Sequence, residues 1–231
     1  MIEPRMFYQL ASWLSPGFPV GAYSHSNGLE WAVQQQLVSS RPTLTAWLEK
    51  LVANGGTRSD AVLLAHSHSA ACACDQNRLL QLAELGSALH PSRERQLESV
   101  AQGAAFRRVA SVAAPCSAFA MLEILQDDEI PYPVVVGAVA AGHGIPVFMT
   151  LTAFLHAVVS NLVSAAQRLI SLGQTDAQLV IAQLSNPVIT LAEWAASNCE
   201  GDPFHLIGSG TLMADLASLA HETQHTRLFR T

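Results

Sequence analysis

The sequence predicts an all-α fold, a single globular, bundle-like domain of about ten helical segments around a buried central helix at about residues 146–170. Between Val147 and Leu169, apolar residues recur at intervals of three and four and leave almost no polar face, as in a helix enclosed by other elements. Half of the 231 residues are apolar, which is enough to bury a large core. The only candidate strand is a short β-branched run, Val134–Val136.

The apolar stretch from Pro133 to Ile170 is predicted to form two helices and no membrane span. Residues 142–146, a Gly-His-Gly corner followed by Ile and Pro, separate a short helix at about 133–142 from the central helix. A membrane span needs about 20 uninterrupted apolar residues. His156 and Asn161 also interrupt the second half, so we expect no membrane partner.

The helices before the central helix follow from apolar spacing and from capping and breaking residues. The proline- and glycine-rich run from Ser15 to Gly21 is predicted to be a turn, and Ser92 is predicted to cap a long helix. We expect helices at about 5–14, from Ser24 or Ser26 through Leu37, from Thr43 to the Gly55-Gly56 pair, and at about 59–73, 77–89, 93–113 and 115–126, with a loop at 127–131.

After the central helix, the residues Thr175 to Gln178 form a capping-box pattern that predicts a new helix start. The Asn186-Pro187 pair is expected to kink or divide that helix. Residues 198–210 are loop-rich, and 211–225 form the last predicted helix. We expect one domain at residues 1–225 and a partner-binding tail at 226–231.

The charge and cysteine content exclude several classes of protein. The net charge is -6 and Lys50 is the only lysine, which argues against nucleic-acid binding. Only 13% of the residues are charged, which favours a surface covered by an oligomer or a partner. The four cysteines form no disulfide framework, and the N-terminal residues lack the pattern of a signal peptide. We therefore expect a cytoplasmic protein with free thiols.

The last helix contains His221-Glu222-Thr223-Gln224-His225, a literal H-E-x-x-H zinc-protease motif. Two histidines four residues apart on a helix can bind zinc, and the glutamate can act as the base. A catalytic zinc site usually has a third protein ligand, and none of the six residues that follow supplies one. The alternative is a solvated helix end that carries histidine for the helix dipole. We expect no metal, no cofactor and no enzymatic activity.

Other polar residues have plain structural interpretations. His68 and Cys72 lie four apart and can share a helix face, but two ligands do not make a structural metal site. His143 and His156 are expected to be buried and hydrogen-bonded. There is no phosphate-binding glycine loop, so an energy-consuming step would belong to a partner.

The tail Thr226–Thr231 sets Leu228 and Phe229 between two arginines. Aromatic residues and arginine are enriched in protein interfaces, whereas chain ends are usually polar and mobile. Two alternatives stay open from the residues alone: the tail anchors a partner, or it folds back on its own core.

Three stretches together resemble the urease accessory protein F family (UreF). They are Leu10 to Glu30 with its SPGFPVGAYSHSNGLE run, the run AAQRLISLGQT at Ala165 to Thr175, and the segment from Met213 to Arg230 with HETQHTRLFR. They occur in the order and spacing of the family and cover nearly the whole chain. The family commonly has Tyr at the position of His225, which makes the zinc motif an accident of one substitution.

The resemblance implies an all-α, non-catalytic cytoplasmic chaperone that helps to deliver nickel into apo-urease. It implies a homodimer that acts with accessory protein D (called H in some organisms) and with the nickel-carrying GTPase, accessory protein G. It also implies that the tail binds accessory protein D, so we expect a tail that is mobile in the free protein and ordered in the complex. The expected partner-binding residues are Glu30, Arg168, Gln174, His221, Glu222, Arg227, Leu228, Phe229 and Arg230.

Two rival functions remain. A GTPase-activating protein would supply a side chain such as Arg168 or Gln174 to the nucleotide site of the partner. A zinc hydrolase would use His221, Glu222 and His225. Because Arg168 is the one charge near the end of the apolar central helix, we expect it to be hydrogen-bonded and to lie at or near a dimer or GTPase-binding face.

Overall fold

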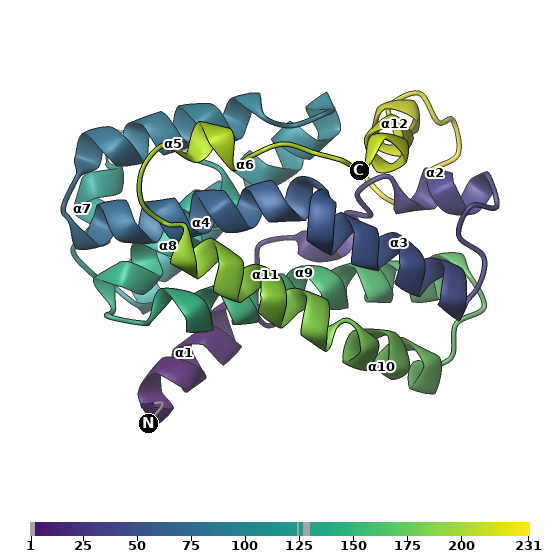
Figure 1. Ribbon diagram of the computed structural model, residues 1–231, viewed down its shortest axis with the longest axis horizontal. Helices are drawn as coiled ribbons and strands as arrows, with labels where there is room; N and C mark the ends of the chain where they lie inside the picture. The colour runs from purple at the N-terminus through teal and green to yellow at the C-terminus, as the bar shows by residue number, and fades with distance from the viewer. Residues whose placement is uncertain (1–2, 124, 127–129) are drawn as a thin grey trace.

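Helices and loops make up the described part of the computed structural model, residues 3–123, 125–126 and 130–231, which contains no β-strand (Figure 1). This confirms the predicted all-α class. The α-helices are α1 Pro4–Trp13, α2 Leu29–Gln34, α3 Arg41–Asn54, α4 Gly56–Cys72, α5 Gln76–Ala88, α6 Arg93–Ala113, α7 Ala118–Leu122, α8 Tyr132–Gly142, α9 Val147–Leu169, α10 Gln174–Gln183, α11 Ser185–Ser197 and α12 Leu212–His221, with 3-10 turns η1 Ala22–Ser24 and η3 Pro203–His205.

The centre of the core is the contact between α4 and α8. Every residue of α8 from Pro133 to Ala140 is buried, and so is the middle of α4 from Ala61 to Ser67. Gly137 lets the two helices approach closely, because a Cβ atom there would lie 2.3 Å from the carbonyl oxygen of Leu64. The run Val134–Val136 lies inside α8, so valines that favour strands are helical here because their burial outweighs local propensity.

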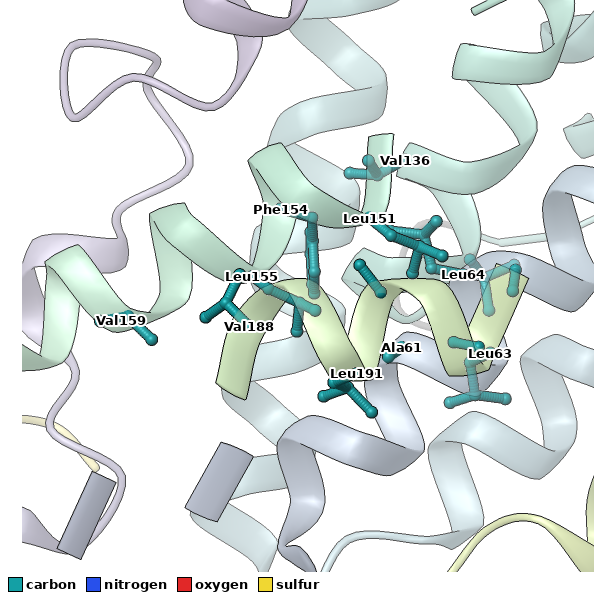
Figure 2. Packing of buried hydrophobic residues seen from close by; sticks show 14 of the residues in the cluster. Ala61, Leu63, Leu64, Val136, Leu151, Phe154, Leu155, Val159, Val188 and Leu191 are labelled. Carbon is teal, nitrogen blue, oxygen red and sulfur yellow. The ribbon is translucent and has the colours of Figure 1, made fainter. Parts of the chain in front are cut away.

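The predicted central helix is α9, and one of its faces packs on the core. Leu151, Phe154 and Leu155 lie toward α4 and α11 (Figure 2). The helix is less enclosed than expected, since Phe148 and His156 are exposed. By length and composition α9 could cross a membrane, but core helices of globular proteins meet the same criterion, so this is weak evidence.

Several helix ends differ from the predictions. Ser92 caps α6 as expected, accepting a hydrogen bond from the Arg95 amide at 3.2 Å. The predicted capping box at Thr175 is wrong, because α10 begins at Gln174 and has no side-chain cap. A capping box forms instead between Ser40 and Thr43 and starts α3 at Arg41.

Other segments are shorter than predicted. Of the helix expected at 24–37 only α2 forms, and of the helix expected at 115–126 only α7 forms. The last helix, expected to reach residue 225, ends at His221. The chain divides between α10 and α11 at Leu184, close to the Asn186-Pro187 pair, as one of the two expected outcomes. Part of the predicted 115–126 helix and of the 127–131 loop lies outside the described residues.

We expect Gly137→Ala to destabilise the protein by about 2–4 kcal/mol, because neither backbone at the α4–α8 contact can move without disturbing the core. For a chain of this length, that corresponds to a fall in melting temperature of roughly 4–16 °C. Urea unfolding followed by circular dichroism measures the change.

The matched control is Gly56→Ala at the start of α4, where an added Cβ atom meets nothing within 4 Å. We expect this variant to be as stable as the wild type or slightly more stable, because alanine favours helix over glycine. Equal stability of Gly137→Ala and Gly56→Ala would show that the α4–α8 contact tolerates a wider spacing.

Candidate partner-binding site

Glu30, in the first turn of α2, is the acceptor around which the C-terminal tail docks. Its carboxylate accepts hydrogen bonds from the backbone amides of Leu228 at 2.7 Å and Phe229 at 3.0 Å. The helix begins directly after Gly28, whose φ of +76° suits glycine, and a Cβ atom there would lie 2.6 Å from the Ser218 amide. This close approach brings α12 onto the start of α2.

His221 links α12 to the same carboxylate. Its ring is fully buried, with Nε2 lying 3.2 Å from Glu30 and Nδ1 lying 2.7 Å from Glu94 on α6. Each ring nitrogen of His221 thus lies within hydrogen-bond distance of a different carboxylate. Arg227 of the tail adds a cation, with its guanidinium 2.5 Å from Glu94. Three helices, α2, α6 and α12, and the tail therefore meet around two paired carboxylates.

The C-terminal end of α12 also closes the N-terminus of α6. The Glu222 carboxylate accepts hydrogen bonds from the amides of Arg93 at 2.7 Å and Glu94 at 3.3 Å. Ser218 pairs with the cap residue Ser92 at 2.6 Å. A carboxylate over the free amides of a helix start is favourable because it also interacts with the helix dipole.

The last residues of the tail pair with the segment before α2. The backbone oxygen of Thr231 accepts from the Ser26 amide at 2.8 Å and the Ser26 hydroxyl at 2.6 Å. The Thr231 hydroxyl donates to Glu98 at 2.8 Å and lies 3.1 Å from His25 Nδ1. The Arg230 amide donates to the carbonyl of Ser24 at 2.8 Å, while its side chain points to solvent.

Burial and neighbouring charges act in opposite directions on the pKa values of Glu98 and His25. Burial alone would raise the pKa of the Glu98 carboxyl, but the adjacent Arg95 guanidinium and His25 more than offset it, and its pKa is lowered. For His25, burial lowers the pKa, and the opposing attraction of Glu98 is too weak to reverse the shift. Glu98 is therefore an ionised acceptor for the Thr231 hydroxyl.

Arg168 at the end of α9 is held between two aromatic rings. Its guanidinium carbon lies 3.7 Å from the centre of the Tyr23 ring and 4.3 Å from that of Phe229. It also donates to the carbonyls of Tyr23 at 2.9 Å and Ser164 at 3.2 Å. The expectation that this charge is hydrogen-bonded is confirmed, and its contacts connect the η1 turn to the tail.

The expectation of a mobile tail is wrong for the single chain. Phe229 is 3% exposed, and the tail folds back on its own domain, which was the alternative left open from the residues. The backbone hydrogen bonds and the arginine–carboxylate pair expected in a complex form within the chain instead. Leu228 differs from Phe229, because its side chain is 63% exposed.

The H-E-x-x-H residues do not share a helix face. The helix ends at His221, while His225 lies beyond it and is exposed. Glu222 is occupied with the start of α6, so the geometry does not support a zinc hydrolase. The alternative of a solvated helix end is also wrong for His221, which is buried between carboxylates.

The outer face of α12 is a feature that the sequence analysis missed. Ala214, Ala217 and Ser218 face the domain. On the other side of the helix four apolar side chains are 45–71% exposed: Leu212, Met213, Leu216 and Leu219. We call these four residues, together with the exposed Leu228 of the tail, the α12 face. The sequence did contain a sign of this face, since every position from 212 to 220 is apolar except Asp215 and Ser218.

The remaining candidate residues lie elsewhere. Gln174 is exposed at the start of α10, on the opposite side of the domain from α12 (Figure 1). His68 Nε2 donates to the carbonyl of Ile145 at 2.8 Å, and its Nδ1 lies 3.7 Å from the sulfur of Cys72. His143 contacts Gln9 at 3.2 Å and the Ala114 carbonyl at 3.0 Å, as expected for a hydrogen-bonded histidine. His156 is exposed, so the expectation of a buried histidine there is wrong.

We expect Glu30→Ala to release the tail, because it removes the acceptor of two backbone amides and leaves His221 with one carboxylate. Hydrogen exchange at the amides of Leu228 and Phe229 should speed up by at least about tenfold, while α4 and α8 stay protected. Glu49→Ala, an exposed glutamate on α3, is the control and should change neither region. Unchanged protection of the two amides in Glu30→Ala would show that the Phe229 packing alone holds the tail.

Comparison with known proteins places this arrangement in a family. The UreF family model matches residues 38–185. A protein of Rhodopseudomonas palustris (strain BisB18), named urease accessory protein UreF, is 50% identical over 231 residues, covering 99% of this chain and 93% of the relative.

Two further relatives have the same name. The protein of R. palustris (strain BisB5) is 48% identical over 228 residues, covering 99% of this chain and 92% of the relative. That of Bradyrhizobium diazoefficiens is 47% identical over 228 residues, covering 99% and 93%. The similarity thus includes α2, α12 and the docked tail, and this chain belongs to the UreF family of urease accessory proteins.

Proposed function

We propose that this protein acts with accessory protein D (or H) and the GTPase G to promote GTP-dependent insertion of nickel into apo-urease. It works by binding alone, as a cytoplasmic homodimer that holds the GTPase and the urease-facing partner in one geometry. The observation that carries the proposal is the similarity over nearly the whole chain to proteins named urease accessory protein UreF. Co-purification of the chain with accessory proteins D and G is the direct test.

The α12 face is the surface that we assign to accessory protein D. Single exposed apolar residues are common, but a row of them on one helix favours a protein contact. Covering a half-exposed leucine contributes about 1 kcal/mol, so several together support a stable complex. The docked tail contributes through Glu30 of α2, which binds both the tail amide of Leu228 and His221 of α12, and it leaves the side chains of Leu228 and Arg230 exposed.

The second candidate function is activation of the partner GTPase. Gln174 is exposed and can reach a partner without rearrangement. Arg168 is less suited to enter a nucleotide site, because its guanidinium is stacked between Tyr23 and Phe229 and bonded to a carbonyl. Gln174 is therefore better suited than Arg168 to act in the nucleotide site of the partner.

We expect the double variant Leu216→Asp/Leu219→Asp to weaken binding to accessory protein D at least about tenfold, because charges on the α12 face would have to be desolvated in the complex. Both side chains are about half exposed, so the melting temperature should stay within about 2 °C of the wild type. Titration calorimetry with purified accessory protein D measures the affinity.

Val112→Asp on α6 is the matched control, since this side chain is 83% exposed and lies outside the α12 face. It should bind accessory protein D like the wild type. If the double variant also binds with full affinity, the α12 face is not the contact.

A GTPase assay separates the scaffold from the activator. With catalytic amounts of this protein, GTP turnover by accessory protein G should stay within about twofold of its basal rate, because a scaffold supplies no group to the nucleotide site. Acceleration that is lost in Gln174→Ala and kept in Gln178→Ala, a neighbouring exposed glutamine on α10, would establish the activator instead.

A further inference from the structure

A cavity of about 510 Å³ lies outside the α12 face and shares the lining residue Glu98 with the contacts of the tail. It is enclosed by the loop Leu14–Tyr23, by the side of α9, and by residues of α4, α6 and α8. Pro19 and His156 line it and are exposed, so it opens to solvent between the loop and α9. The volume is within the usual range for small-molecule sites.

The lining of the cavity combines apolar side chains with a group of polar ones, which we call the floor. Phe18, Val20, Phe154 and Val158 supply the walls. Polar side chains from α4 and α6 and from the segment before α2 form the floor: Asn27, Thr57, Asp60, Arg95, Glu98 and Gln102. An apolar cavity with a few convergent polar groups is the usual form of a ligand site.

Most of the floor is internally paired. The Arg95 guanidinium contacts both Glu98 and Asn27, and Gln102 donates to Glu98 at 3.1 Å. The charges of Arg95 and Glu98 balance each other, so these residues form a rigid base with no net charge.

Asp60 and Thr57 of the floor, and Tyr132 of α8, lie outside this network. Among the described residues neither the Asp60 carboxyl nor the Tyr132 hydroxyl has a hydrogen-bond partner, and both line the cavity. Burial raises the pKa of Asp60 to about 6, although Arg95 opposes the shift. Asp60 also lines an adjoining cavity of about 220 Å³, which shares Asn27, Thr57 and Arg95 with the larger one. An unpaired carboxylate in such a position destabilises the fold unless something binds to it.

We propose that this cavity binds a small organic cation, an amidine or primary amine on an apolar body, and that Asp60 pairs with its charged head. At neutral pH the Asp60 carboxylate is the unbalanced charge of the floor. An amidinium offers two parallel N–H groups to a carboxylate, and the Tyr132 hydroxyl can accept a further hydrogen bond. The apolar walls fit the body of the ligand.

The pH dependence follows from the groups that face Asp60. These are Arg95 and Glu98 on α6, Asp215 on α12, and His90 after α5, whose pKa burial lowers to about 4. Tyr132 and His156 also line the cavity. At pH 7.5, well above the pKa of Asp60, its carboxyl is ionised and carries a negative charge at the cavity. Cation affinity should fall as the pH drops below about 6, because Asp60 is then protonated.

Benzamidine is the probe, with the neutral isostere benzamide and the anion benzoate as matched ligands. At pH 7.5 we expect benzamidine to bind about tenfold to hundredfold more tightly than benzamide, the effect of a charged hydrogen bond, and benzoate not to bind. Titration calorimetry measures the affinities. Protein NMR should place the shifts in the loop at residues 14–23 and in α9.

Asp60→Asn should remove the preference for benzamidine, and Glu49→Gln, the same change on exposed α3, should keep it. Asp60→Asn should also stabilise the protein at pH 7.5. The folded-state pKa is raised, so the native state holds the extra proton and the wild type loses stability as the pH rises from about 4 to about 6.

The proposal is overturned if benzamidine does not bind at millimolar concentration, if benzamide binds equally well, or if Asp60→Asn binds benzamidine like the wild type. Tyr132→Phe gives a second check, with an expected loss of a few-fold at most. All these measurements use the isolated full chain, so their outcome does not depend on the proposed role in urease maturation.

Discussion

The close contact between α4 and α8 is the constraint on which the rest of the structure depends. It exists because Gly137 has no side chain between its backbone and the Leu64 carbonyl. A second glycine allows an equally close approach on α6, since a Cβ atom at Gly103 would lie 2.0 Å from the carbonyl of Ile130, just before α8. The position of α6 is thus fixed against the core, and α6 carries the carboxylates Glu94 and Glu98 to the tail.

Charge is scarce in this chain, and several of its buried or partly buried charged groups lie where elements distant in sequence meet. Glu30, Glu94 and Glu98 come from two helices and face His221, Arg227 and Arg95. Buried ion pairs add little net stability, because desolvation offsets much of the attraction, but leaving one partner unpaired is costly. Such pairs favour one arrangement of α2, α6, α12 and the tail over alternatives of similar apolar burial. The position of the apolar α12 face depends on this arrangement, because His221 and Glu222 hold α12 in place.

Glu98 belongs to both sites. It accepts from the Thr231 hydroxyl of the docked tail, and with Arg95 it forms part of the cavity floor. A change in the charge of the cavity therefore acts on a carboxylate that also holds the tail. The distance between the two sites is short because both are built on the first turns of α6.

The sequence by itself determined the all-α class and the location of most helices. Apolar spacing located α9, Ser92 marked the start of α6, and the family motifs identified Glu30 and the tail as important. These features are local, because capping and amphipathic spacing are set by residues a few positions apart. Gln174 was expected to bind partners together with the tail residues only because it lies in a family motif. The fold places it at the start of α10, far from the tail.

Only the tertiary structure decided what these residues contact. It buried Phe229 and left Leu228 exposed, two adjacent residues of similar apolar character. It separated His221 from His225 by ending the helix between them, and it placed Arg168 between two rings from opposite ends of the chain. The cavity around Asp60 also joins distant segments. Each outcome depends on how helices pack across the core, and that depends on glycine contacts and buried charge pairs between residues far apart in sequence.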